Sequence, residues 1–171
     1  MIRKPGKHKV TNEAITANRR RLLNNDSPFA IKEAYVKLRT SLMFCMAKDK
    51  ALPCTTFAIT SAKPSEGKSL TAANIAISYA MLGKKVLLID ADAQANLTMS
   101  LGYNRPDDLP VTLSTIMQDI IDDKSVDVAQ SILHHGEGVD LLPSNIELSG
   151  LEVRLINAIS RESVLKTCVN E

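Results

Sequence analysis

The sequence has few cysteines and few aromatic residues, and it contains no long hydrophobic segment. Its three cysteines, Cys45, Cys54 and Cys168, are too few and too scattered to indicate a disulfide framework or a zinc site. Tryptophan is absent and aromatic residues make up 4% of the chain, so no base-stacking platform is indicated. No apolar run approaches the roughly 18 residues of a membrane span, and no signal peptide is recognisable. These absences predict a cytoplasmic protein with reduced thiols.

Positive charge is concentrated near the N-terminus. The first 50 residues contain 12 lysine and arginine residues against 4 acidic residues, whereas the remainder contains 9 against 15. We therefore expect residues 1–27 to form a basic flexible arm and residues 28–171 to form one folded domain. Such an arm can contact the phosphates of nucleic acid or of anionic lipid, although an uncommitted solvated arm is an equally good interpretation.

The most informative stretch is a loop between a predicted strand and a predicted helix. Residues 56–60 (TFAIT) are short and β-prone, and residues 70–82 are rich in alanine and end at Gly83. Between them, residues 62–69 follow the phosphate-binding pattern G-x-x-x-x-G-K-[ST], except that Ala62 replaces the first glycine. A loop in this position directs backbone N–H groups and the positive end of the helix dipole at one spot, which suits a polyphosphate. The alternative is an ordinary turn that opens a helix.

The residue types in this loop predict separate roles. Gly67 allows the backbone to approach phosphates closely because it has no Cβ. We expect Lys68 to reach the β- and γ-phosphates of a nucleoside triphosphate and Ser69 to offer its hydroxyl to Mg²⁺.

Two aspartates follow the next predicted strand. Residues 86–89 (VLLI) are suited to a parallel strand buried on both faces, and Asp90 and Asp92 come directly after it. Ligands of α/β proteins bind at the carboxyl ends of parallel strands. Alternation along the strand predicts that both carboxylates point to the same side, where one would hold Mg²⁺ or its waters and the other would orient an attacking water. They could instead cap the helix that follows.

Together these motifs resemble the deviant Walker A ATPases of the ParA/MinD group. That group has a second lysine five residues before the usual one, a spacing matched by Lys63 and Lys68, whereas Pro64 and Ser65 replace its two glycines. The resemblance implies that ATP or ADP is bound, with Mg²⁺, by one continuous stretch. Its residues are Lys63, Pro64, Ser65, Glu66, Gly67, Lys68, Ser69 and Leu70.

The same resemblance implies a mechanism and partners. In the ParA/MinD group the residue corresponding to Lys63 reaches the partner's phosphates in an ATP-bound homodimer, so Lys63 and Asp92 are the expected catalytic residues and Ser69 and Asp90 the expected metal-site residues. The expected function is an ATPase switch that dimerises with ATP, binds DNA without sequence preference and answers to a ParB-like centromere-binding protein. A partition protein of this type would be associated with the nucleoid.

The expected fold is α/β, a three-layer P-loop NTPase with a parallel sheet and helices on both faces. Besides the segments above, we expect a strand at 139–142 and several helices. The helices are expected at 29–47, 113–121, 126–133, 149–159 and 162–169. No apolar run of four ending in aspartate, the Walker B strand of a complete domain, occurs after Asn96. We therefore expect the N-terminal part of such a domain, truncated at the C-terminus.

Two alternatives remain open at this point. Residues 27–43 together with the loop are similar to bacterial tyrosine kinases of capsule synthesis, which carry E-x-x-R-x-x-R on the helix before the loop. Glu33 and Arg39 match that motif, but Val36 stands at its first arginine. The third reading is a nucleotide-binding fragment that does not hydrolyse ATP.

Overall fold

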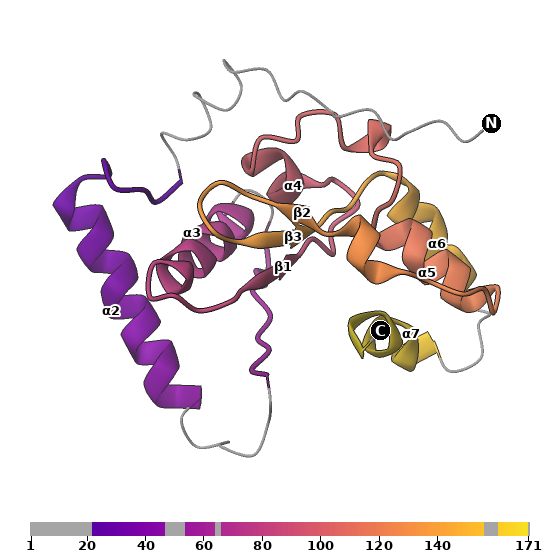
Figure 1. The fold of residues 1–171 in the computed structure, drawn as a ribbon, viewed down its shortest axis with the longest axis horizontal. Helices are drawn as coiled ribbons and strands as arrows, with labels where there is room; N and C mark the ends of the chain where they lie inside the picture. Colours follow the sequence, from indigo (N-terminus) through magenta and orange to yellow (C-terminus); the bar gives the residue numbers. More distant parts are fainter. Residues whose placement is uncertain (1–21, 47–53, 64–65, 156–160, 171) are drawn as a thin grey trace.

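The computed structural model describes residues 22–46, 54–63, 66–155 and 161–170 of the chain. It contains helices around a small central sheet (Figure 1). The elements in chain order are α2 (Phe29–Met46), α3 (Lys68–Ala80), β1 (Leu87–Ile89), α4 (Asn96–Ser100), the 3-10 turn η1 (Pro106–Asp108), α5 (Leu113–Ile121), the 3-10 turn η2 (Val128–Ser131), β2 (Leu133–His134), β3 (Asp140–Leu142), α6 (Glu147–Leu155) and α7 (Arg161–Asn170).

The sheet has the strand order β1-β3-β2 and is mixed. β1 pairs with β3 in parallel, with Leu88 opposite Leu141, as expected for an α/β fold. β2 pairs with β3 in antiparallel orientation, which departs from the purely parallel sheet that we expected. The cause is a tight turn between β2 and β3. In this turn the N–H of His135 donates to the carbonyl of Val139 over 2.9 Å, and Gly138 has a φ of +80°.

The β2–β3 pairing also shows that one predicted helix was wrong. The helix expected at residues 126–133 is reduced to η2, and its last residue belongs to β2. Pairing of Leu133 with Leu141 in the antiparallel ladder ends the segment in a strand, which a helix continuing to residue 133 would not allow.

Alternating side chains of the two parallel strands divide the core into two clusters. Leu88 and Leu141 face α3 and α4 in the first cluster, whereas Leu142 and Ile89 pack in the second cluster against α5, α6 and α7. The alternation follows from the two-residue period of a strand. The predicted arrangement of helices on both faces of the sheet is therefore confirmed, and Figure 1 shows the two helix groups on either side.

The strand expected at residues 56–60 is not formed. Residues 55–61 carry no regular secondary structure, and Phe57 in their middle is 44% exposed. A β-prone sequence becomes a strand only where a ladder partner is available. Residues 55–61 form no such ladder: among the described residues the outer edge of β1 has no strand partner, so β-prone composition alone did not produce a strand here.

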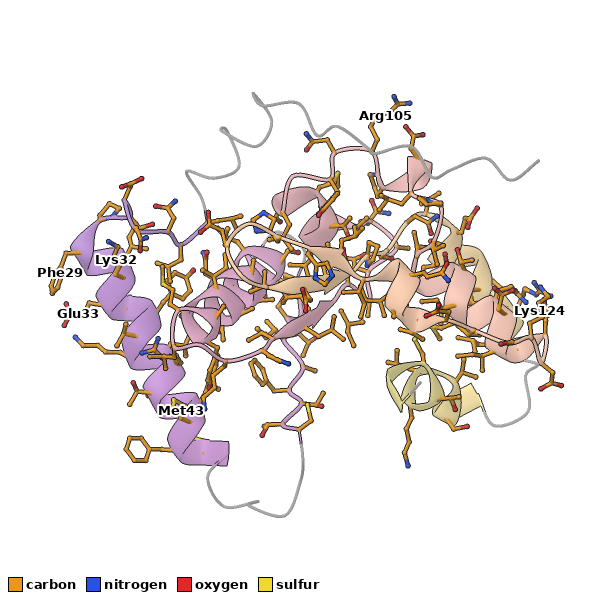
Figure 2. All side chains as sticks on the ribbon, in the orientation of Figure 1. Phe29, Lys32, Glu33, Met43, Arg105 and Lys124 are labelled. Atoms are coloured by element: carbon orange, nitrogen blue, oxygen red, sulfur yellow. The ribbon has the colours of Figure 1, made fainter. Side chains whose placement is uncertain are left out.

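The helix expected at 29–47 is confirmed as α2, but it packs on the rest of the molecule along one narrow line. Arg39 donates from a guanidinium nitrogen to the carbonyl of Ser78 in α3 over 2.6 Å. Residues outside this line are exposed: Phe29 is 79% and Phe44 75% accessible, and Figure 2 shows Phe29 directed away from the other elements. The apolar stripe read from the sequence is thus only partly buried.

Asn74 of α3 connects this helix and the chain before it to the first core cluster. Its side chain is 2% exposed, its carbonyl oxygen accepts a hydrogen bond from the N–H of Leu23 over 2.7 Å, and its amide donates to the hydroxyl of Tyr35 over 3.0 Å. Leu22 and Leu23 are 3% and 2% exposed and belong to that cluster. Packing therefore begins before the arm boundary expected at residue 27; the expected arm up to residue 21 lies outside the described residues.

Replacing Asn74 with alanine should lower the free energy of unfolding by about 1–3 kcal/mol, because the buried N–H of Leu23 would lose its acceptor. Urea denaturation followed by circular dichroism measures this change. Asn25, an exposed residue of the same type, provides the control, and its alanine variant should change stability by less than about 0.5 kcal/mol. Equal stability of the Asn74 variant and the wild type would show that this connection does not stabilise the fold.

Candidate functional site

The phosphate-loop motif leads directly into α3. Gly67 precedes the helix with a φ of +85° and a ψ of 20°, a left-handed conformation that favours glycine. Among the described residues, no side chain caps the helix start. The first N–H groups of a helix have no partner within the helix, so the uncapped start of α3 presents donors and the positive dipole end to whatever lies in front of it.

What lies in front is an open cavity of about 480 Å³. Two groups of residues form its wall: the start of α3 on one side, and α4 with its neighbouring loops on the other. The lining residues are Glu66, Gly67, Lys68, Ser69, Leu70, Asp92, Asn96, Met99, Ser100 and Asn104. The structure thus brings six of the predicted site residues together at one cavity.

Four lining residues were not predicted as site residues. Asn96, Met99 and Ser100 lie on α4, and Asn104 lies just after it. Asn96 lies four residues after Asp92, but no sequence pattern indicated a helix of five residues here. The turn before α4 determines its position: Ala95 has a φ of 51° and is 1% exposed. Left-handed backbone at alanine costs roughly 1–2 kcal/mol.

Lys63 is exposed and does not line the cavity. Its backbone carbonyl accepts a hydrogen bond from the hydroxyl of Ser61 over 2.9 Å, which shapes the chain before the motif. Pro64 and Ser65 lie outside the described residues. The roles predicted for these three residues remain predictions.

The two aspartates after β1 have different environments. Asp92 is partly exposed and lines the cavity, and its carboxylate accepts a hydrogen bond from the N–H of Gln94 over 3.0 Å. Asp90 is 3% exposed and is absent from the described cavity wall. We predicted both carboxylates on one side from strand alternation, but β1 ends at Ile89 and alternation does not extend past it.

Asp90 instead faces α4. One carboxylate oxygen accepts two hydrogen bonds from Thr98, from its N–H over 2.8 Å and from its hydroxyl over 2.7 Å. The other oxygen accepts the N–H of Asp92 over 3.3 Å. Burial raises the pKa of the Asp90 carboxyl, and the Thr98 bonds oppose that rise. The predicted magnesium role of Asp90 stays a prediction.

Comparison with known proteins identifies the family. A family model described as an AAA domain matches residues 54–171, more than half of the chain. The chain belongs to this family. Within it, the chain is a P-loop ATPase of the ParA/MinD type, as the paired lysine spacing and the Asp90–Asp92 motif indicated.

Two curated relatives agree with this assignment. The sporulation initiation inhibitor protein Soj of Bacillus subtilis is 36% identical over 110 residues, which make up 64% of this chain and 41% of Soj. The chromosome partitioning protein ParA of Caulobacter vibrioides is 33% identical over 105 residues, 61% of this chain and 38% of that protein. The chain therefore spans less than half the length of these relatives.

A solved structure shares the fold. Cobyrinic acid a,c-diamide synthase from Mycobacterium smegmatis, crystallised with an ATP analogue and magnesium, superposes with a TM-score of 0.59 at 34% identity, covering 65% of this chain and 43% of that chain. The α/β fold class is thereby confirmed. Nucleotide and Mg²⁺ are used by a protein with this architecture.

The residues at the cavity are compatible with such a ligand. A Cβ at Gly67 would meet no atom of the described residues within 4 Å, and Lys68 supplies a positive charge at the cavity wall. Ser69 and Asp92 supply the oxygen ligands that Mg²⁺ prefers. Among the described residues, no cluster of three or more histidine, cysteine or acidic residues forms a metal site, and no helix is long and apolar enough to cross a membrane.

The raised pKa of Asp90 predicts a pH-dependent contribution to stability. The folded state binds the Asp90 proton more tightly than the unfolded state, so this group stabilises the fold at low pH, and the stabilisation is lost as pH rises through its folded-state pKa. Asp90→Asn should remove this term. The free energy of unfolding of the wild type, minus that of the variant, should therefore increase as pH falls from 7 towards 4.

Urea denaturation at several pH values measures that difference. Asp127→Asn, at an exposed carboxyl on the surface, serves as the control. A difference that stays constant with pH, or that shrinks on acidification, would contradict a raised pKa at Asp90.

Proposed function

We propose that this chain is the nucleotide-binding part of an ATP- and Mg²⁺-dependent ATPase switch of the ParA type. The observation that supports the proposal best is the composition of one cavity wall. The uncapped start of α3, with Lys68 and Ser69, lies across the cavity from the carboxylate of Asp92. This wall therefore combines groups that would serve as phosphate donors, as a cation ligand and as an acceptor for the attacking water.

Binding would depend mainly on the start of α3. Backbone N–H groups after Gly67 would donate to the phosphates of ATP or ADP, and Lys68 would add a charge-assisted hydrogen bond. The hydroxyl of Ser69 would hold Mg²⁺, which would neutralise charge on the phosphate oxygens. Asp92 would accept a hydrogen bond from the water that attacks the terminal phosphate.

Lys63 would act on a second copy of the chain. Its side chain is exposed and lies off the wall of its own cavity, so it is accessible to another subunit. A cation supplied in trans stabilises the charge of the transition state and can raise the rate of phosphoryl transfer by roughly 10³–10⁵. ATP-dependent dimerisation would then be a condition for hydrolysis.

The relatives suggest the biological setting. Soj is named as a sporulation initiation inhibitor and the Caulobacter relative as a chromosome partitioning protein. We propose that this protein acts in the cytoplasm, at the nucleoid, where ATP-bound dimers hold DNA through backbone phosphates and a ParB-like partner stimulates release. The basic residues near the N-terminus supply charge for such contacts.

No contact in the described residues favours a tyrosine kinase. Glu33 forms an ion pair with Lys37 over 2.7 Å, and Arg39 donates to the carbonyl of Ser78. Both matching residues of the kinase-like motif therefore have partners within the chain, and the helix is accounted for by packing on α3.

Lys68→Ala should weaken Mg-ATP binding by about 1.5–3 kcal/mol, the range for a hydrogen bond to a charged group, which corresponds to roughly 10–150-fold. Isothermal titration calorimetry measures this. Lys85→Ala changes an equally charged but exposed residue away from the cavity and should leave affinity unchanged. If the wild type binds Mg-ATP and Lys68→Ala binds it equally well, the proposed phosphate contact is wrong.

The Lys63→Ala variant tests whether Lys63 has a different role from Lys68. It should bind Mg-ATP nearly as tightly as the wild type, because Lys63 lies off the cavity wall, yet it should no longer dimerise when ATP is added. Sedimentation velocity with and without ATP reports the oligomeric state, and the Lys85→Ala variant again provides the comparison. Loss of nucleotide affinity equal to that of Lys68→Ala would show that Lys63 acts within its own subunit.

A further inference from the structure

Thr98 lies at a junction of three segments. It is completely buried on α4, and both its N–H and its hydroxyl donate to the same carboxylate oxygen of Asp90. The hydroxyl also accepts a hydrogen bond from the N–H of Ser144 over 3.2 Å. One side chain thus ties α4 to the end of β1 and to the chain that follows β3.

The segments that Thr98 joins carry the far wall of the cavity. Asn96 and Ser100 of α4 line that wall on either side of Thr98 along the helix. Asp92 lines it as well, and its N–H donates to the second carboxylate oxygen of Asp90. Asp90 therefore connects both α4 and the Asp92 loop to the end of β1, and both connections depend on the position of its carboxylate.

Burial makes this arrangement sensitive to the hydroxyl. A buried carboxylate is costly unless it is hydrogen-bonded, and bonds to a charged acceptor are about twice as strong as neutral ones. Without the hydroxyl, Asp90 would lose one of its donors and the N–H of Ser144 its acceptor. The Ser144 hydroxyl is itself buried without a partner among the described residues, so this junction already contains one unsatisfied polar group.

We propose that Thr98 is a positioning residue for nucleotide binding: through Asp90 it fixes α4 and the Asp92 loop at the distance from α3 that Mg-nucleotide requires. The inference rests on the proposed function of the cavity. Thr98 itself is not on the cavity wall, so its effect on a ligand is transmitted through Asp90, Asp92 and α4.

The test compares Thr98→Val, which keeps the shape and removes the hydroxyl, with Thr98→Ser, which keeps the hydroxyl. Titration calorimetry with Mg-ATP should show affinity reduced about 10–100-fold in the valine variant, the range for groups that orient a metal site. The serine variant should stay within about 3-fold of the wild type. Val164→Ala, in the second core cluster, controls for general loss of stability.

Amide hydrogen exchange without nucleotide provides a readout independent of binding. Peptides covering residues 91–101 should exchange faster in Thr98→Val than in the wild type or in Thr98→Ser, while the α5 peptide should not change. Equal Mg-ATP affinity in Thr98→Val and the wild type would overturn the proposal. So would an equal loss of affinity in the valine and serine variants. An equal loss in Val164→Ala, when its melting temperature matches that of Thr98→Val, would overturn it as well.

Failure of the cavity function itself gives a different pattern. If the wild type binds no Mg-ATP, the proposed function is wrong, and so is the proposal that Thr98 positions the site for a nucleotide. Amide exchange in residues 91–101 then still shows whether Thr98 anchors α4. Should Thr98→Val fail to fold, as judged by circular dichroism, Asp90→Asn replaces it. Its amide group cannot accept the N–H of Asp92 and the two bonds of Thr98 together, so reduced affinity together with faster exchange in residues 91–101 is expected. Unchanged affinity, or reduced affinity with unchanged exchange, overturns the proposal.

Discussion

The hydrogen bonds between Asp90 and Thr98 are the interaction on which the arrangement of the site depends. The parallel pair β1–β3 supplies a frame, but no residue of either strand lines the cavity, and the lining residues after β1 lie on loops and on the short helix α4. A five-residue helix such as α4 is too short to be stable by itself, so its position must be set by tertiary contacts. The buried carboxylate provides that contact, and the cost of burying it is partly offset by three donors from two residues.

This arrangement separates the two aspartates that the sequence places side by side. Asp90 is turned towards Thr98, whereas Asp92 lines the cavity. The left-handed turn at Ala95 follows from the same constraint, because the chain must reverse quickly after Asp92 for Thr98 to reach back to Asp90. The left-handed backbone of Ala95 costs some conformational energy, and the charge-assisted hydrogen bonds from Thr98 to Asp90 offset that cost.

Much of this fold was predictable from local sequence. The predicted helix at 113–121 coincides with α5, because apolar spacing is reinforced by a capping box between Thr112 and Thr115. The helix expected at 126–133 was wrong because its end pairs with β3, a tertiary contact that local patterns do not encode. The strand expected at 56–60 did not form although the outer edge of β1 has no strand partner among the described residues. In the site, Gly67, Lys68 and Ser69 were predictable because one loop and one helix start fix them. Asn104 and the inward turn of Asp90 depend on residues far apart in the chain.

The two walls of the cavity are therefore held by different means, and this has a consequence for how the protein would respond to a ligand. The α3 wall is part of a long helix whose buried face packs in the first core cluster, so it is rigid before any ligand arrives. The α4 wall is a short helix attached through one buried carboxylate and through Leu97 and Leu101 in the same cluster. A ligand that contacts both walls would chiefly order the second. Conformational change on nucleotide binding would then begin at α4 and the Asp92 loop, and not at the phosphate-binding helix.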